Sequence, residues 1–134
     1  MVVRMDFDLA EACAAVAAGS LDQIRPAWKD GAGVCVVMAS GGYPGDFQTG
    51  KRIEGLAEAG AVADAVVFHA GTRLERSIYY TSGGRVLGVT AFGPDLEASR
   101  RACYEAVSKI RFENAHYRTD IGAQGVSSTR AAKD

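Results

Sequence analysis

The chain has 134 residues, of which 48% are hydrophobic, and its 15 Lys and Arg nearly balance its 16 Asp and Glu. This length predicts one domain, the hydrophobic content excludes a wholly disordered chain, and the small net charge excludes a global basic field for nucleic acid. Glycine is the outlier, with 16 residues, about 12% against an ordinary share of about 7%.

The first predicted element is a helix over residues 8–19. Asp8 and Glu11 have the spacing of a capping box, and Gly19 stands where a left-handed C-cap belongs. Because a helix of this length is marginal in water, it needs a surface to pack against. Its apolar face consists of Leu9, Cys13, Val16 and Ala17.

Strand patterns follow from residue 24. Trp28 and the apolar run 34–38 flank residues 30–33, which predicts a hairpin. Since the run is apolar at consecutive positions, we expect both of its faces to be covered. A glycine-rich loop occupies residues 40–50, and residues 51–60 are ambiguous between an extended stretch and a short helix.

The remaining pattern alternates strands and turns before a second helix. Residues 65–68 predict a strand, and residues 77–81 and 85–92 predict two strands around a turn in which Gly83 and Gly84 supply positive φ. A strong helix is expected from Asp95 to about residue 110, then an irregular stretch or short strand over 112–121. The order of elements predicts an α+β fold with a mainly antiparallel sheet.

The cysteines indicate a reducing compartment. Cys13, Cys35 and Cys103 are odd in number, widely spaced and without a CxxC pair, which argues against a disulfide framework or a zinc knuckle. The N-terminal stretch carries acidic residues where a signal peptide needs an apolar core, and no apolar run approaches the ~18 residues of a membrane span. We expect a soluble, cytoplasmic protein without nucleic-acid or membrane partners.

The glycine-rich loop 40–50 has two interpretations. Its glycines allow a ligand to approach the backbone, consecutive amides can bind an anion, and Lys51 and Arg52 add charge. The loop lacks the spacing of a P-loop and has no convincing helix after it. From the residues alone it is either a connection or a ligand-binding loop.

Two further residues, His69 and Arg85, have side chains capable of binding or proton transfer, but the sequence around them does not require either role. His69 ends a strand beside Gly71 and Thr72, where it either exchanges a proton or is a half-buried, hydrogen-bonded histidine. Arg85 follows the turn and can bind a phosphate or carboxylate through two hydrogen bonds. No metal-ligand set and no complete catalytic constellation occurs in the sequence.

Taken in order, the loop motifs resemble those of one family. The segments are ASGGYPG at 39–45, KRIEGL at 51–56, VVFHAGT at 66–72, TSGGRVLGVTAFG at 81–93, and IRF with HYRTDIG at 110–122. Their order and spacing are similar to the C-terminal region of glycinamide ribonucleotide synthetase, also called phosphoribosylamine–glycine ligase. The resemblance covers about residues 5–122, and several motifs in register are far more specific than any one of them.

This resemblance implies an ATP-grasp ligase of purine biosynthesis. ATP, held with magnesium or manganese, activates the carboxylate of glycine, and 5-phosphoribosylamine then attacks to give glycinamide ribonucleotide, ADP and phosphate. The implied fold is a small antiparallel sheet or half-barrel with flanking helices, as in the C-terminal domain of biotin carboxylase. Residues 1–22 would be the closing helix of an ATP-grasp region, 23–122 the C-terminal domain and 123–134 a disordered tail.

The family residues that hold metal and nucleotide have no counterpart in this chain. We therefore expect no cofactor here, no activity of the chain alone, and partnership with the N-terminal and ATP-grasp domains. The helix at 8–19, without those domains, is expected to promote self-association. Two other functions stay open, a non-catalytic binding module that retains the fold and an independent phosphate-binding enzyme.

The resemblance identifies candidate substrate-cleft positions but no catalytic residue and no metal ligand. Their expected role is to shape the site and position substrate. At two other positions the chain departs from the family, with Arg73 where Lys is common and Asn114 where Gly is common, and asparagine tolerates the same left-handed backbone. The candidates are Ser40, Gly41, Gly42, Tyr43, Pro44, His69, Gly71, Thr72 and Arg85.

Overall fold

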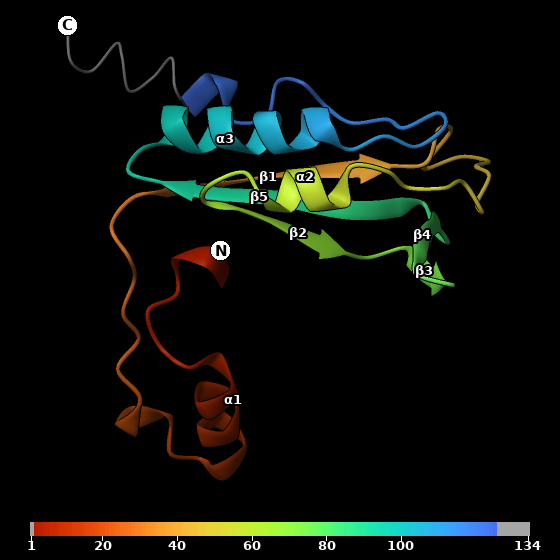
Figure 1. Cartoon of the computed structure of the whole chain (residues 1–134). Helices are drawn as coiled ribbons and strands as arrows, with labels where there is room; N and C mark the ends of the chain where they lie inside the picture. Colours follow the sequence, from red (N-terminus) through yellow and green to blue (C-terminus); the bar gives the residue numbers. More distant parts are fainter. Residues whose placement is uncertain (1, 126–134) are drawn as a thin grey trace, which may run out of the picture.

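The computed structural model describes residues 2–125, and they form a sheet covered on one side by helices (Figure 1). The fold class is α+β with antiparallel sheets, as predicted. The elements in chain order are η1 (Val2–Arg4), α1 (Leu9–Ala18), η2 (Leu21–Gln23), β1 (Ala32–Ala39), α2 (Leu56–Gly60), β2 (Ala65–His69), β3 (Thr72–Glu75), β4 (Ile78–Thr81), β5 (Arg85–Gly93) and α3 (Leu96–Lys109).

The central sheet has the order β1-β5-β2, and both of its pairings are antiparallel. Val89 of β5 lies between Val36 of β1 and Val67 of β2. Because successive side chains of a strand alternate between faces, one face of this sheet collects the buried residues. The strands β3 and β4 form a separate two-stranded sheet at one end (Figure 1).

Helix α3 closes the core, as its sequence predicts. The Asp95 side chain caps it by accepting a hydrogen bond from the Ala98 amide at 2.8 Å. The helix buries Cys103 among the sheet's valines, and the Cys103 thiol donates to the Val89 carbonyl at 3.2 Å. Burial in this apolar setting raises the pKa of the Cys103 thiol to about 11.

Both hairpins predicted from the sequence are wrong. Trp28 forms only an isolated bridge with Met5, and β1 pairs instead with β5, more than forty residues later in the chain. Likewise β4 pairs with β3, a strand absent from the prediction, rather than with β5. Neither Gly83 nor Gly84 has a positive φ, and the turn residues that do are Arg76 and Ser77 between β3 and β4.

The prediction that β1 is covered on both faces is also wrong. Its residues alternate, with Val34, Val36 and Met38 buried and Val37 exposed. Strand β2 exposes Val66 and Phe68 on the same face. We call this surface the open face and define it by Cys35, Val37, Val66 and Phe68.

Helix α1 has the caps predicted for it but not the packing. Asp8 accepts from the amides of Ala10 and Glu11, and Gly19 takes the left-handed conformation. The predicted apolar face does not become buried, since Leu9 is 44% and Val16 60% exposed. The helix stands away from the sheet (Figure 1) and buries only Ala12 and Ala15.

The carboxyl-terminal segment is fastened to α3 by side chains. Arg100 donates to the carbonyls of Ile121 and Thr119, and the Tyr104 hydroxyl accepts from the Ile121 amide at 3.1 Å. Residues 123–125, at the start of the predicted tail, are helical, and the rest of that segment lies outside the described residues. Within residues 2–125, no helix has the length and apolar content to cross a membrane.

Candidate functional site

Four segments converge beyond one end of the central sheet. We call this region the loop junction and define it as residues 39–50, 69–72, 81–85 and 111–116. Backbone hydrogen bonds join the segments, with the Ser40 amide donating to the Gly84 carbonyl and the Ser82 amide to the Gly71 carbonyl, each at 2.8 Å. The Ala39 amide donates to the His116 carbonyl at 2.7 Å. The motifs that carry the family resemblance therefore meet in space.

The glycines of the junction allow its backbones to touch. A Cβ on Gly71 would lie 2.6 Å from the Arg85 carbonyl oxygen and 2.8 Å from the Gly83 Cα, and a Cβ on Gly41 would lie 2.7 Å from the Asn114 carbonyl oxygen. These neighbours are backbone atoms that cannot move aside. The glycines thus have a structural role in addition to the ligand role expected from the sequence.

Asn114 stands where glycine is common in the family, and it takes the left-handed backbone conformation predicted for that position. Its φ is 58°, and its backbone lies against Gly41. This conformation brings the segment after α3 into the junction. The expectation that asparagine preserves the backbone here is confirmed.

Tyr43 and Pro44 form the outer part of the junction. The peptide between them is cis, and the Tyr43 ring packs directly on Gly84, where no side chain would fit. The ring also meets Phe47 edge to face, with the ring centres 5.9 Å apart. Tyr43 nevertheless stays 37% exposed, so it offers an aromatic edge at the surface.

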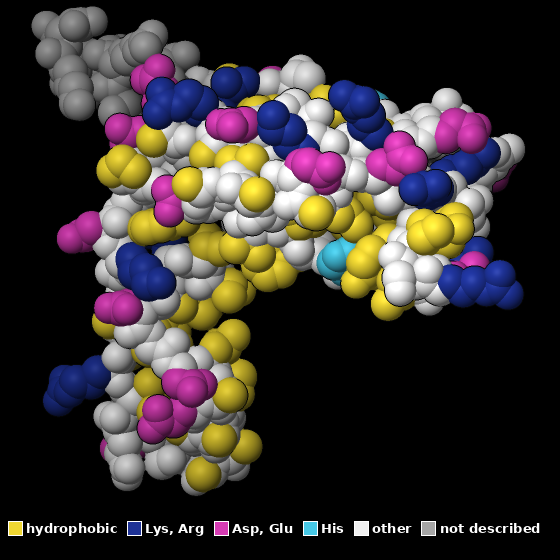
Figure 2. Space-filling model, viewed as in Figure 1, with side chains coloured by type: hydrophobic (Ala, Val, Ile, Leu, Met, Phe, Trp, Pro, Cys, Tyr) yellow, Lys and Arg dark blue, Asp and Glu magenta, His cyan; other side chains and the backbone are white. Residues whose placement is uncertain are grey.

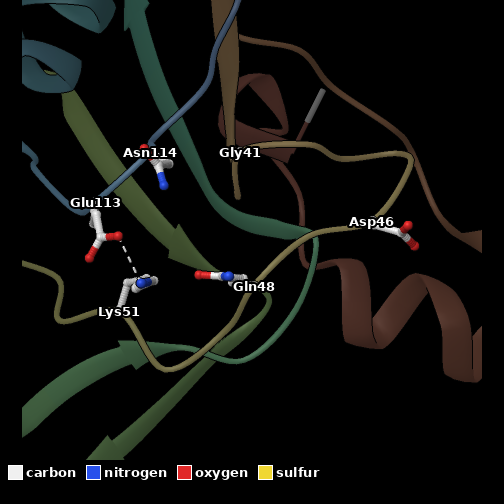
Figure 3. Close-up of a pocket in the computed structure, with 6 residues that line it drawn as sticks. All are labelled: Gly41, Asp46, Gln48, Lys51, Glu113 and Asn114. Atoms are coloured by element: carbon white, nitrogen blue, oxygen red, sulfur yellow. Dashed lines mark hydrogen bonds and ion pairs between the residues drawn. The ribbon is translucent and has the colours of Figure 1, made fainter.

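A polar pocket opens inside the junction (Figure 3). At about 250 Å³ it lies just below the size of a typical drug-sized ligand site. Its ammonium group comes from Lys51, which pairs with the Glu113 carboxylate at 2.8 Å. The lining residues are Gly41, Asp46, Gln48, Lys51, Glu113 and Asn114.

The lining of this pocket is charged and polar. One ammonium and two carboxylates, with the amides of Gln48 and Asn114, present donors and acceptors to a small polar molecule. Figure 3 shows Lys51, Glu113 and Gln48 close together and Asp46 farther away. The Lys51 side chain is 23% exposed, so its ammonium is partly desolvated while Glu113 stays largely in solvent.

The other predicted positions lie outside the pocket. His69 is exposed, its Nδ1 is 3.0 Å from the Thr72 hydroxyl, and its ring lies on Tyr79 at a centroid distance of 4.4 Å. Arg85 is exposed at the start of β5. Of the nine candidates only Gly41 lines the pocket, whereas Ser40 and Gly71 hold the junction together.

Sequence reasoning identified only one side of the pocket, the loop 40–50 with the charge of Lys51 after it. It did not join Glu113 and Asn114 to that loop as one site. Local sequence carries no signal for this arrangement because Lys51 and Glu113 are 62 residues apart. Among residues 2–125, no three His, Cys, Asp or Glu side chains gather as a metal-ion site.

Comparison with known proteins decides the family. A family model described as phosphoribosylglycinamide synthetase, C domain, matches residues 33–124. The chain belongs to this family. The matched residues include β1 to β5, α3 and the whole loop junction, whereas α1 precedes them.

Named relatives agree with the family match. The chain is 51% identical over 104 residues to the phosphoribosylamine–glycine ligase of Synechocystis sp., covering 77% of this chain and 25% of that protein. It is 43% identical over 130 residues to the ligase of Pseudomonas aeruginosa, covering 97% of this chain and 30% of that protein. The chain therefore spans a quarter to three tenths of the length of these relatives.

A solved structure supports the fold. The crystal structure of phosphoribosylamine–glycine ligase from Thermotoga maritima matches 83% of this chain and 26% of its own, with a TM-score of 0.69 and 32% identity. The similarity therefore extends from the motifs to the arrangement of helices and strands. Family membership and fold thus rest on independent comparisons.

Proposed function

We propose that this chain supplies the carboxyl-terminal part of a phosphoribosylamine–glycine ligase. The reaction joins glycine to 5-phosphoribosylamine, with cleavage of ATP to ADP and phosphate, in cytoplasmic purine biosynthesis. The observation that carries this proposal is the family match over residues 33–124, which spans the entire loop junction. Relatives with 51% and 43% identity bear the name of this ligase.

The chain's own role in this proposal is to form a wall of the substrate cleft. The segments of the loop junction are in close backbone contact at Gly71 and Gly41. A rigid wall can orient a small substrate without taking part in proton transfer. Tyr43 and the Lys51 pocket provide the aromatic edge and the polar groups that face such a substrate.

ATP and its magnesium or manganese ion belong, in this proposal, to the other domains of the enzyme. The bound nucleotide would supply the phosphoryl group that activates the carboxylate of glycine. Among the described residues, no three acidic, His or Cys side chains converge. We assign no step of the ATP chemistry to this chain.

Complementation tests the proposal. The amino-terminal and ATP-grasp domains of the Pseudomonas aeruginosa relative, produced without their carboxyl-terminal part, would be mixed with this chain. We expect ligase activity from the mixture and none from either component. Its control is the same domains mixed with a chain carrying Gly71→Val, which disrupts the junction.

A different outcome separates this function from a non-catalytic binding module. Binding to the relative's domains without restored turnover would favour an interaction module that retained the fold. Turnover of glycine, phosphoribosylamine and ATP by the chain alone would contradict the division of labour proposed here.

A further inference from the structure

The two ends of the Lys51–Glu113 ion pair belong to segments that backbone hydrogen bonds hold in place. The Lys51 amide donates to the Thr81 hydroxyl at 3.0 Å, and the Lys51 carbonyl accepts from the Thr81 amide at 2.8 Å. Thr81 is completely buried, so this anchor belongs to the core of the fold. On the other side, Arg111 exchanges two backbone hydrogen bonds with Glu54, two residues before Glu113. The ion pair therefore joins two segments that are already aligned.

The charges that line the Lys51 pocket have both signs. One ammonium, from Lys51, stands against the two carboxylates of Asp46 and Glu113, so the lining carries a net charge of −1. The ammonium is already paired with Glu113 at 2.8 Å. On the face shown in Figure 2, Lys and Arg side chains are likewise interspersed with Asp and Glu side chains. The pocket thus offers no excess of positive charge to an anion.

This balance of charges disfavours a phosphate ligand. A phosphate monoester carries a charge of about −1.5 to −2 near pH 7, and in this pocket it would share Lys51 with Glu113 while it faced Asp46. Like charges brought together in a partly desolvated site repel each other. Loop 40–50 also leads into an extended stretch rather than a helix N-terminus, which is the common backbone site for phosphate. The pocket therefore does not match the anion that the glycine-rich loop allows in the sequence.

A small zwitterion matches the same groups. An α-amino acid carries its ammonium and its carboxylate on one carbon, so it presents two opposite charges at a short separation, as the ion pair itself does. When the amino acid lies beside the ion pair in the opposite direction, its carboxylate meets Lys51 and its ammonium meets Glu113. The net charge of the pocket is unchanged, and every charge of the ligand has a partner.

The other lining groups fit the size and polarity of such a molecule. Gln48 and Asn114 bring side-chain amides beside the ion pair (Figure 3), and within residues 2–125 neither amide has a hydrogen-bond partner. Each amide can donate to a carboxylate or accept from an ammonium. The pocket measures about 250 Å³, and no hydrophobic residue lines it. It therefore favours an amino acid with little or no side chain.

We propose that the Lys51 pocket is an amino-acid subsite, in which Lys51 binds the carboxylate of glycine and Glu113 binds its ammonium. The identity of the amino acid rests on the proposed ligase function, whereas the chemical class, a small zwitterion, rests on the pocket alone. Of the two organic substrates of that reaction, 5-phosphoribosylamine is then bound elsewhere, because its phosphate does not fit this charge balance. Lys51 and Glu113 bind and position, and no proton transfer is assigned to them.

Binding of glycine to this chain tests the subsite directly. Nuclear magnetic resonance titration of the labelled chain measures the dissociation constant, and we expect about 1–10 mM because so small a ligand makes few contacts. Glycinamide lacks the carboxylate and N-acetylglycine lacks the ammonium, so each should bind about tenfold more weakly or less. Ribose 5-phosphate, the probe for a phosphate site, should also bind more weakly than glycine.

Two substitutions assign the binding to the pocket. Lys51→Met and Glu113→Gln each remove one of the paired charges, and each should weaken glycine binding about tenfold or more. Arg52→Met and Glu54→Gln are the matched controls, because these residues form a neighbouring ion pair at 3.3 Å and neither lines the pocket. They should leave the dissociation constant within about twofold of its wild-type value. Circular dichroism verifies the folding of every variant.

Several results would overturn the proposal. One is a folded chain that does not bind glycine at all. Another is equal binding of glycine and either blocked analogue, because one of the two charges would then contribute nothing. Tighter binding of ribose 5-phosphate would make the pocket a phosphate site instead. An equal loss of glycine binding in the control variants would place the ligand outside the pocket.

The complemented ligase separates this proposal from the proposed function. Lys51→Met should raise the KM for glycine about tenfold or more and leave the KM for 5-phosphoribosylamine within about twofold. If the mixture is inactive but the chain binds glycine through Lys51 and Glu113, the proposed function fails and the zwitterion subsite stands. If the mixture is active and Lys51→Met leaves the KM for glycine unchanged, the subsite fails and the proposed function stands.

Discussion

The Ser40 hydroxyl donates a hydrogen bond to the Gly83 carbonyl at 2.9 Å and joins two segments that lie 43 residues apart in the sequence. Ser40 is 3% exposed, so its hydroxyl has little access to water as an alternative partner. The two glycine motifs that gave the family resemblance are thus locked to each other.

Removing the Ser40 hydroxyl should destabilise the fold. Ser40→Ala leaves the Gly83 carbonyl without this donor, and we expect the free energy of unfolding to fall by about 1–2 kcal/mol. Urea denaturation measures the change. Ser108→Ala, which removes an exposed hydroxyl bonded within α3, is the control and should change stability by less than about 0.5 kcal/mol. Equal effects of the two substitutions would contradict the importance of the contact.

Gly71 should tolerate no side chain, whereas Gly60 should. A methyl group at Gly71 would lie 2.6–2.9 Å from backbone atoms of Arg85 and Gly83, but at Gly60 it would meet nothing within 4 Å. We expect Gly71→Ala to cost about 1–3 kcal/mol through overpacking. Gly60→Ala should be neutral or slightly stabilising, since Gly60 is helical. Thermal unfolding of the two variants measures the difference, and similar melting temperatures would contradict it.

The two longer helices, α1 and α3, could be predicted because their signals are local, whereas the short α2 was left ambiguous. Asp8 and Gly19 mark the ends of α1, and Asp95 marks the start of α3. Strand pairing is local only in part, and both predicted hairpins failed. Strand β4 forms a tight hairpin with β3, which precedes it in sequence, whereas β1 pairs with β5 from a distant part of the chain.

The candidate site could be predicted only in part. Family motifs identified the loop that contains Ser40 and Gly41, because a motif keeps its spacing. They could not show that Glu113 reaches Lys51, a contact that depends on how the segment after α3 turns back at Asn114. Consecutive apolar residues in β1 likewise predicted two covered faces, although only the packing of α3 shows which face is buried.

Because of Cys103, the stability of the fold should decrease with rising pH in the alkaline range. Burial raises its thiol pKa from 9.0 to about 11, so the unfolded chain loses this proton at a lower pH than the folded chain. The contribution of this thiol to the free energy of unfolding is therefore complete below about pH 9. It is lost as the pH rises toward about 11. We expect a loss of at most about 3 kcal/mol.

Urea denaturation of the Cys103→Ala variant checks this contribution. The difference in pH dependence between wild type and variant isolates the thiol from other groups that titrate in this range. Cys13→Ala, which removes an exposed thiol, is the control and should keep the wild-type profile. Identical profiles for wild type and Cys103→Ala would show that the Cys103 thiol contributes nothing.

Lys51 should matter more to the complemented ligase than to the stability of the chain. Its ion pair with Glu113 is partly exposed, so Lys51→Met should change the free energy of unfolding by no more than about 1 kcal/mol. If the pocket positions substrate, the same substitution removes its only ammonium and should lower kcat/KM of the complemented enzyme about tenfold or more, equivalent to about 1.4 kcal/mol. Arg52→Met is the matched control, because the neighbouring Arg52 side chain is 61% exposed and pairs with Glu54 outside the pocket. Steady-state kinetics of the two mixtures give the comparison. Equal kcat/KM values for the two variants would show that Lys51 is only a surface charge and that the pocket is not part of the substrate cleft.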